Sequence, residues 1–271
     1  MRQCFPEEKA ITKAPVIGTC PLCLAKNQRL CDSHLLPQAA YKPLRSESRT
    51  NPHPQLLGPT GAYTSSKQFH KHLLCAGCEE RFHQGGEGWV LEHSCRSDGT
   101  FKFRDILFRC PPACEKGESR VYSGAQNPGL DMDKVIYFAA SIVWRGGTGP
   151  WERDDRVIDI DLGKYKEPLR RFLLSREGFP TGTLLHTWVS SADGPALAVC
   201  HQPEEHRFDG MRAITFAVPG INFRWTVASH IPDRYMKCGT APATGRFIGV
   251  VPDRDREDHA RMLGRLWNRP V

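Results

Sequence analysis

The sequence predicts an α+β protein made of three successive parts: an N-terminal zinc module, a helical connector and a C-terminal antiparallel β-sheet. Two Cys-x-x-Cys pairs frame the first third of the chain, two helical hydrophobic patterns occupy the middle, and period-two alternation begins near residue 183. We therefore divide the chain into a lead-in at 1–18, a zinc module at 19–93, an irregular and helical connector at 94–180, and an antiparallel β region with a terminal helix at 181–271.

Size and composition narrow the class of protein. The chain has 271 residues, of which 39% are hydrophobic, enough to bury a sizeable core. No run of 18 apolar residues occurs and the N-terminus has no apolar signal segment, so we expect no membrane contact and a cytoplasmic location. The net charge is +7, with most of the excess in the first 110 residues. Such an excess suits a nucleic-acid partner, because Lys and Arg release counterions from phosphates.

Cysteine spacing carries the strongest chemical signal. The chain has eleven cysteines, and in a reducing compartment paired Cys-x-x-Cys motifs are more typical of metal ligands than of disulfides. The turn within each motif directs both sulfurs toward one ion, so two motifs complete a tetrahedral site. The alternative is a set of buried free cysteines. We predict one structural Zn²⁺ bound by Cys20, Cys23, Cys75 and Cys78.

The elements around these cysteines can be ordered along the chain. A short polar hairpin carrying His34 follows the first pair, and residues 42–66 are rich in Pro, Ser, Thr and Gly, which predicts a long loop. A short strand then leads into the second pair. We expect a helix to begin near Ala76 and to end at Gly85–Gly86.

The connector contains two amphipathic helices. In residues 130–147 apolar side chains recur at helical spacing, Asp131 or Asp133 can cap the start, and Gly146–Gly147 can end the helix. A second helix is predicted within 162–176, where Pro168 must lie in the first turn or cause a kink.

The last part of the chain alternates with period two, which predicts strands. Turn residues separate the strands, so an antiparallel meander is expected, followed by a helix from about Asp255 to Trp267. The predicted strands are residues 183–189, 195–201, 213–218, 221–227 and 246–251.

The strings CPLC, DSHLLP and LLCAGCEERF, with their order and spacing, give the N-terminal part a family resemblance. Over about residues 18–90 the chain resembles HNH (ββα-metal) endonucleases, within a largely uncharacterised bacterial set of such zinc proteins. The resemblance implies a treble-clef zinc module, a catalytic Mg²⁺ or Mn²⁺, and hydrolysis of phosphodiester bonds in nucleic acid, with DNA as the expected substrate. It also implies that His34 is the general base that activates water.

Two positions depart from the family pattern. Ser33 stands where the hairpin of these nucleases carries a metal-binding Asp, and Glu79 stands where the helix carries Asn or His. The resemblance then implies that Glu79 holds the catalytic ion, with help from Asp32 or Glu87. The same exchange is consistent with a site that has lost its ion.

Two other classes of function remain open. In one, the scaffold keeps its zinc and serves as a catalytically inactive module that binds nucleic acid or protein. In the other, the protein is structural and its C-terminal region forms a homo-oligomer. Some further candidates have less regular spacing. His93, Cys95, Cys110 and Cys114 could form a second metal site, and His70 could brace the loop that carries His34 or lie in an exposed basic strand. Arg145, Arg170 and Arg171 could contact phosphate, lie on solvated faces or belong to an interface.

Overall fold

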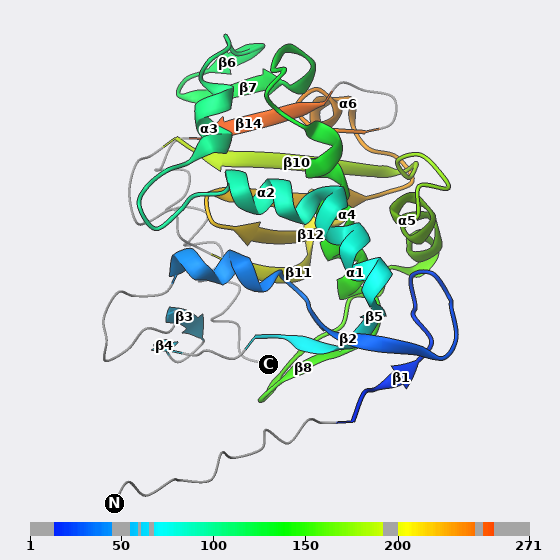
Figure 1. The fold of residues 1–271 in the computed structure, drawn as a ribbon. Coiled ribbons are helices and arrows are strands. Elements are labelled where there is room, and N and C mark those ends of the chain that lie inside the picture. The colour runs from blue at the N-terminus through cyan, green and yellow to red at the C-terminus, as the bar shows by residue number, and fades with distance from the viewer. Residues whose placement is uncertain are drawn as a thin grey trace, which may run out of the picture.

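The computed structural model has the mixed α+β class that the sequence predicts, with a three-stranded sheet and a seven-stranded sheet as its main β-structure (Figure 1). Two further hairpins stand apart from these sheets. The structure describes residues 14–44, 55–58, 61–64, 68–191, 200–241 and 246–251.

The N-terminal module is a small antiparallel sheet with a helix packed across it. Strands β1 (Ile17–Gly18), β2 (Gln28–His34) and β5 (His70–Cys75) pair in that order, and α1 (Ala76–Phe82) follows β5 directly. The start of α1 at Ala76 is as predicted. A 3-10 helix, η1 (Gln38–Leu44), follows β2.

The predicted loop at 42–66 is wrong in part, because it contains a hairpin of β3 (Gln55–Gly58) and β4 (Gly61–Thr64). The many turn-forming residues of this stretch favoured a loop in the prediction, which therefore missed two short strands. Leu56 pairs with Tyr63 in this hairpin, and such residues favour strands.

The helix that follows the second cysteine pair does not end at Gly85–Gly86. It continues as a π-helical turn, η2 (His83–Glu87), into α2 (Gly88–His93). The glycines are needed for close packing instead: a Cβ at Gly86 would lie 2.4 Å from the Lys134 carbonyl oxygen of a neighbouring helix. Because glycine has no Cβ, the two glycines let this segment pack closely against the neighbouring helix while it stays helical itself.

That neighbouring helix, α4 (Met132–Gly146), is the longest of the described part and is formed as predicted. Asp131 caps its start by accepting a hydrogen bond from the Lys134 amide, and Gly147 follows its last residue. The second predicted helix is α5 (Lys166–Leu173), with Pro168 in its first turn. Shorter elements of the connector are α3 (Lys102–Leu107), η3 (Gly124–Gln126), η4 (Gly163–Tyr165) and the hairpin of β8 (Trp151–Arg153) and β9 (Arg156–Ile158).

The large sheet has the strand order β11-β12-β13-β10-β14-β7-β6. Four of its strands confirm predictions from the period-two pattern, but the sheet is not a simple meander, since β10 pairs antiparallel with β13 and parallel with β14. The bounds are β6 (Cys114–Lys116), β7 (Ser119–Ser123), β10 (Thr183–Ser190), β11 (His201–Phe208), β12 (Met211–Val218), β13 (Ile221–Val227) and β14 (Phe247–Val251).

Three strands of this sheet were not predicted. β6 and β7 come from the stretch expected to be irregular, and β11 is polar. Among the described strands β11 lies at the edge of the sheet and pairs with β12 alone, so most of its side chains need not enter a core. Of the predicted strand at 195–201, residues 195–199 lie outside the described part, as does the predicted helix at 255–267.

The core lies between α4 and the large sheet (Figure 1). Phe138 of α4 packs edge-on against Phe223 of β13, with ring centroids 5.5 Å apart, and Phe216 of β12 stacks on Phe223.

A short helix, α6 (Asp233–Met236), precedes β14. No helix in the described ranges is both long and apolar enough to cross a bilayer.

Candidate zinc centre and the adjoining cleft

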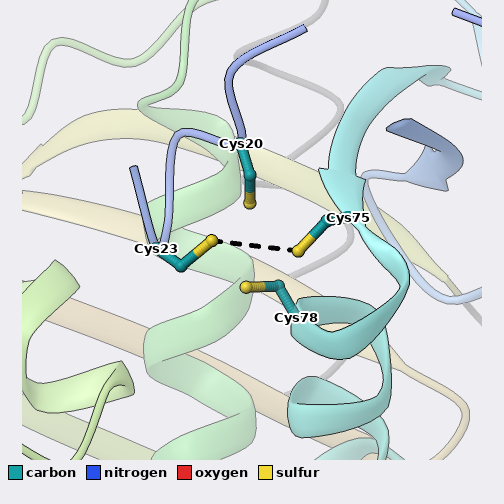
Figure 2. A group of neighbouring side chains, drawn as sticks. All are labelled: Cys20, Cys23, Cys75 and Cys78. Carbon is teal, nitrogen blue, oxygen red and sulfur yellow. Dashed lines mark hydrogen bonds between the residues drawn. The ribbon is translucent and has the colours of Figure 1, made fainter. Parts of the chain in front are cut away.

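The two cysteine pairs meet as predicted (Figure 2). Cys20 and Cys23 lie in the turn before β2, where the Leu24 amide donates to the Cys20 carbonyl. Cys75 ends β5 and Cys78 lies in the first turn of α1. The strand-to-helix junction therefore aims both sulfurs of the second pair at the first turn.

The geometry of the four sulfurs fits a tetrahedral metal ion such as zinc. All four sulfur atoms lie within 4.8 Å of one another, and the Cys23 and Cys75 Sγ atoms are 3.8 Å apart. Tetrahedral zinc with bonds of about 2.3 Å to sulfur separates its ligands by about 3.8 Å. Hydrogen bonding between Cys78 and Cys20 lowers the pKa of Cys20 to about 4 and raises that of Cys78, so a thiolate is already favoured there.

The candidates for a second metal site, His93, Cys95, Cys110 and Cys114, all lie in the described part of the chain and do not form one. Among the described residues, the four cysteines above are the one group of three or more Cys, His, Asp or Glu side chains close enough to hold an ion. The His93 ring stacks on Trp89, with centroids 4.0 Å apart, and Cys110 Sγ contacts the Gln126 carbonyl oxygen at 3.3 Å. These side chains have separate local contacts instead of a common centre.

Beside the cysteine cluster lies a cleft of about 810 Å³, and it brings together the three residues predicted to be catalytic. His34 comes from the end of β2, Glu79 from α1 and Glu87 from η2. Burial lowers the pKa of His34, which keeps its imidazole neutral and able to accept a proton at neutral pH. Its ring stacks on that of His70, with centroids 5.7 Å apart.

The structure gives Asp32 and His70 a shared contact that the sequence did not reveal. His70 Nδ1 and Asp32 Oδ1 are 2.7 Å apart across the β2–β5 ladder, and both side chains are about half exposed. Asp32 lines the cleft but is occupied by this pair. The Asp32 carboxylate raises the pKa of His34, but this effect is smaller than the lowering caused by burial.

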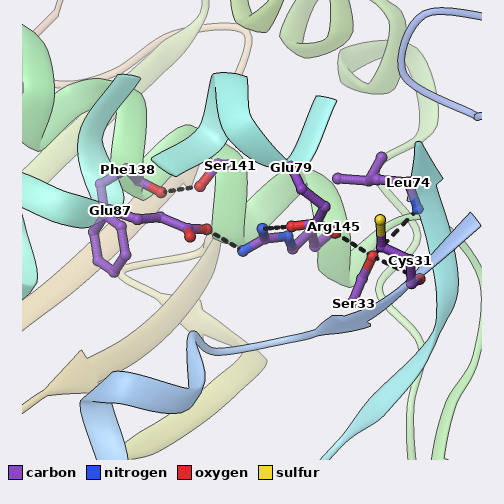
Figure 3. A network of polar contacts seen from close by, with 8 residues as sticks. All are labelled: Cys31, Ser33, Leu74, Glu79, Glu87, Phe138, Ser141 and Arg145. Atoms are coloured by element: carbon purple, nitrogen blue, oxygen red, sulfur yellow. Dashed lines mark hydrogen bonds and ion pairs between the residues drawn. The ribbon is translucent and has the colours of Figure 1, made fainter. Parts of the chain in front are cut away.

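The two glutamates are joined by an arginine (Figure 3). Arg145 of α4 donates from Nη1 to Glu87 Oε1 at 2.5 Å and from Nη2 to Glu79 Oε2 at 3.4 Å. Ser33 Oγ donates to the other carboxylate oxygen of Glu79. The same Ser33 Oγ accepts a hydrogen bond from the Leu74 amide at 3.2 Å. Ser33 and Glu79, the two residues that depart from the nuclease pattern, are therefore joined by a hydrogen bond.

Arg145 is the part of this network that sequence reasoning missed. It was expected to contact phosphate or to be solvated, yet its side chain is 2% exposed and its guanidinium lies over the Phe82 ring. A signal was present: Arg145 follows Phe138 and Ile142 at i+7 and i+3, so it continues the buried stripe of α4. A charged residue on a buried stripe requires a partner in the protein interior.

The carboxylates do not fit a ready-made site for the expected Mg²⁺ or Mn²⁺. Both oxygens of Glu79 and one of Glu87 are engaged by Ser33 and Arg145, whose guanidinium already supplies a positive charge to both acids. An ion would compete with this guanidinium for the same lone pairs. We therefore derive no step through a divalent ion.

The charge of the cleft is mixed and slightly acidic. Five carboxylates and three permanent cations line it, together with His34 and His83. The acids are Asp32, Glu79, Glu87, Glu92 and Asp98, and the cations are Lys42, Arg96 and Arg145.

Two other arginines that were candidates for phosphate contacts have structural partners. Arg170 of α5 donates to the Leu22 carbonyl inside the first cysteine turn at 2.7 Å and pairs with Glu167. Arg171 pairs with Glu167 and Glu177. Arg170 thus links α5 to the cysteine centre.

Comparisons of this chain with models of protein families, with curated proteins and with solved structures gave no match.

Proposed function

We propose that this protein is a zinc-organised, HNH-like endonuclease that hydrolyses phosphodiester bonds of nucleic acid, with DNA as the expected substrate. The observation that carries the proposal is that His34, Glu79 and Glu87, predicted from separate segments, line one cleft next to the cysteine centre. The antiparallel pair β2–β5 with α1 packed on it also supports a ββα arrangement.

In this proposal Zn²⁺ at the four cysteines holds the hairpin and α1 in register. His34 takes a proton from a water molecule that attacks the phosphorus, the bond from phosphorus to the leaving sugar oxygen breaks, and that oxygen takes a proton from solvent. His34 lines the cleft, and its lowered pKa leaves the imidazole unprotonated at neutral pH. Arg145 pairs with both Glu79 and Glu87 and so fixes the two carboxylates in position. Lys42 and Arg96 supply positive charge toward a bound phosphate.

The test uses the zinc-loaded full chain with plasmid DNA, single-stranded DNA and RNA. Each reaction is run in metal-depleted buffer and again with Mg²⁺ or Mn²⁺. Zinc content is measured before and after, because a strong chelator could remove zinc from the cysteines as well. His34→Ala is compared with His72→Ala, a histidine of the same hairpin that contacts the Leu30 carbonyl and does not line the cleft.

We expect cleavage by the native protein and by His72→Ala, and its loss in folded His34→Ala. Cleavage that persists in His34→Ala would contradict the assignment of the base. A folded, zinc-containing protein that cleaves none of the three substrates under any of these conditions would contradict the proposal of an endonuclease.

One observation favours a second candidate, the catalytically inactive zinc-organised binding module. The network of Ser33, Glu79, Arg145 and Glu87 satisfies its charges largely within the protein and leaves the cleft slightly acidic. In that case the protein would bind nucleic acid or a partner protein without cleaving it. Gel-shift measurements on the samples above distinguish binding without cleavage from the absence of both.

A further inference from the structure

The face of the large sheet that points away from α4 carries a cationic side chain with no acidic partner among the residues that the structure describes. Side chains alternate between the two faces along a strand, and Phe223 of β13 packs on Phe138 of α4. The next residue, Arg224, is therefore directed to the opposite face. His186 of β10 stands directly across from Arg224 in the strand register.

Aromatic rings enclose the Arg224 guanidinium. Its central carbon lies 3.5 Å from the centroid of the Phe208 ring and 5.5 Å from that of Trp188. Ring faces stabilise a cation, but they do not replace the hydrogen bonds that a guanidinium makes in water. The aromatic contacts fix the position of Arg224 and leave its hydrogen-bonding edge to other groups.

No such group is found in the described part of the chain. Arg224 Nε is buried without a hydrogen-bond partner, and no described carboxylate pairs with Arg224. Burial lowers the pKa of Arg224 to about 10, so the side chain still carries its charge at neutral pH. A partly buried cation without an anion is costly, and proteins normally pair such groups.

Two more unpaired polar atoms lie on the same face. Thr226 is two residues from Arg224 on β13, and its buried Oγ1 has no hydrogen-bond partner in the described ranges. His186 is 6% exposed, its Nε2 lies 3.2 Å from the Tyr235 carbonyl oxygen, and its Nδ1 likewise has no partner among the described residues. Three neighbouring positions thus keep unsatisfied polar atoms, whereas buried polar groups in proteins are usually paired.

We propose that Arg224 is the centre of a binding site for the carboxylate or phosphate group of a small molecule. The guanidinium can donate to an oxyanion, and Phe208 and Trp188 provide apolar walls beside it. The site shares no residue with the cleft beside the cysteine centre. The inference therefore does not rest on the proposed phosphodiester cleavage.

Calorimetric titration of the zinc-loaded full chain tests the proposal with three probes: benzoate, inorganic phosphate and 5′-AMP. Binding of benzoate alone identifies a carboxylate site, and binding of phosphate or 5′-AMP identifies a phosphate site. Arg224→Met is compared with Arg212→Met, because Arg212 lies in the same sheet but is already held by both carboxylate oxygens of Glu205.

We expect at least one probe to bind, Arg224→Met to weaken it by at least about tenfold, and Arg212→Met to leave it unchanged. Binding of none of the three probes, or equal binding by native protein and Arg224→Met, overturns the proposal.

A second measurement separates a ligand site from a structural cation. If Arg224 is kept for a ligand, Arg224→Met removes an uncompensated charge, and the ligand-free melting temperature stays the same or rises. A clear fall in that temperature, or failure of Arg224→Met to fold, assigns Arg224 a structural role and overturns the proposal.

Discussion

Arg145 Nη1 lies 2.5 Å from Glu87 Oε1, although 58 residues separate the two in the chain. This contact joins the buried stripe of α4 to the helix that begins at the second cysteine pair. Since the same guanidinium also reaches Glu79, one side chain sets the position of both acids in the cleft. The position of both acids in the cleft therefore depends on a buried side chain of α4.

Arg145→Met should destabilise the protein, because it leaves the Glu79 and Glu87 carboxylates without their cation in a partly buried position. Removing one member of a buried ion pair costs about 3–5 kcal/mol. The free energy of unfolding in urea measures the loss. The surface variant Arg171→Met should lose no more than about 1 kcal/mol.

The second variant in this test is Arg145→Met combined with Glu87→Gln, which removes the buried charge together with its partner. It should recover part of the lost stability. Equal stability of the native protein and the single variant would show that the ion pairs of Arg145 contribute nothing net to folding.

Cys75→Ser should abolish stoichiometric zinc binding and lower the melting temperature, because three thiolates hold the ion less tightly than four and the metal contributes to folding. Cys31→Ser is the matched control, as Cys31 lies on the same hairpin outside the cluster. Metal analysis of the purified proteins gives the zinc content. A Cys75→Ser protein that retains one zinc ion with unchanged melting would contradict the four-cysteine site.

Gly86→Ala should destabilise the protein by about 2 kcal/mol or more, because the new Cβ would lie 2.4 Å from the Lys134 carbonyl oxygen and 2.8 Å from the Phe138 amide nitrogen. Backbone atoms cannot move aside as a flexible side chain can. Gly77→Ala is the control, since a Cβ there meets nothing within 4 Å and alanine favours the helix. The free energy of unfolding in urea is measured for both variants. Similar losses of stability at the two sites would contradict the close packing of η2 against α4.

His186 should make stability depend on pH. Burial, aided by the charge of Arg224, lowers its pKa in the folded protein from 6.5 to about 4. The unfolded chain therefore binds the proton more readily, and the stabilising contribution present above pH 6.5 is lost as the pH falls toward 4. At 1.36 kcal/mol per pH unit, the loss by pH 5 is about 2 kcal/mol.

The variant His186→Gln isolates this effect from other groups, which include the neighbouring Cys238 and the zinc thiolates. Its unfolding free energy should fall less than that of the native protein between pH 7.5 and pH 5, while the exposed control His72→Gln should follow the native protein. Parallel pH profiles for native protein and His186→Gln would exclude a lowered pKa for His186.

The sequence by itself determined the features that rest on local spacing. The Cys-x-x-Cys spacing predicted the cluster of four cysteines that could hold a metal ion, the helical stripe and Asp131 predicted α4, and period-two alternation predicted β10, β12, β13 and β14. Each of these signals needs only residues close in the chain, since turn geometry and side-chain periodicity are local properties. The meeting of His34, Glu79 and Glu87 was expected from the resemblance, and all three line the cleft.

Tertiary structure alone decided the partners of these elements. The role of Arg145 is set by its ion pairs with Glu79 and Glu87. The glycines at 85–86 allow the close approach of α4 and do not mark the end of a helix. The polar edge strand β11 and the connector strands β6 and β7 are stabilised by the neighbours they pair with rather than by their own pattern. Such contacts join segments distant in sequence, and their energies depend on burial and pairing that no single segment encodes.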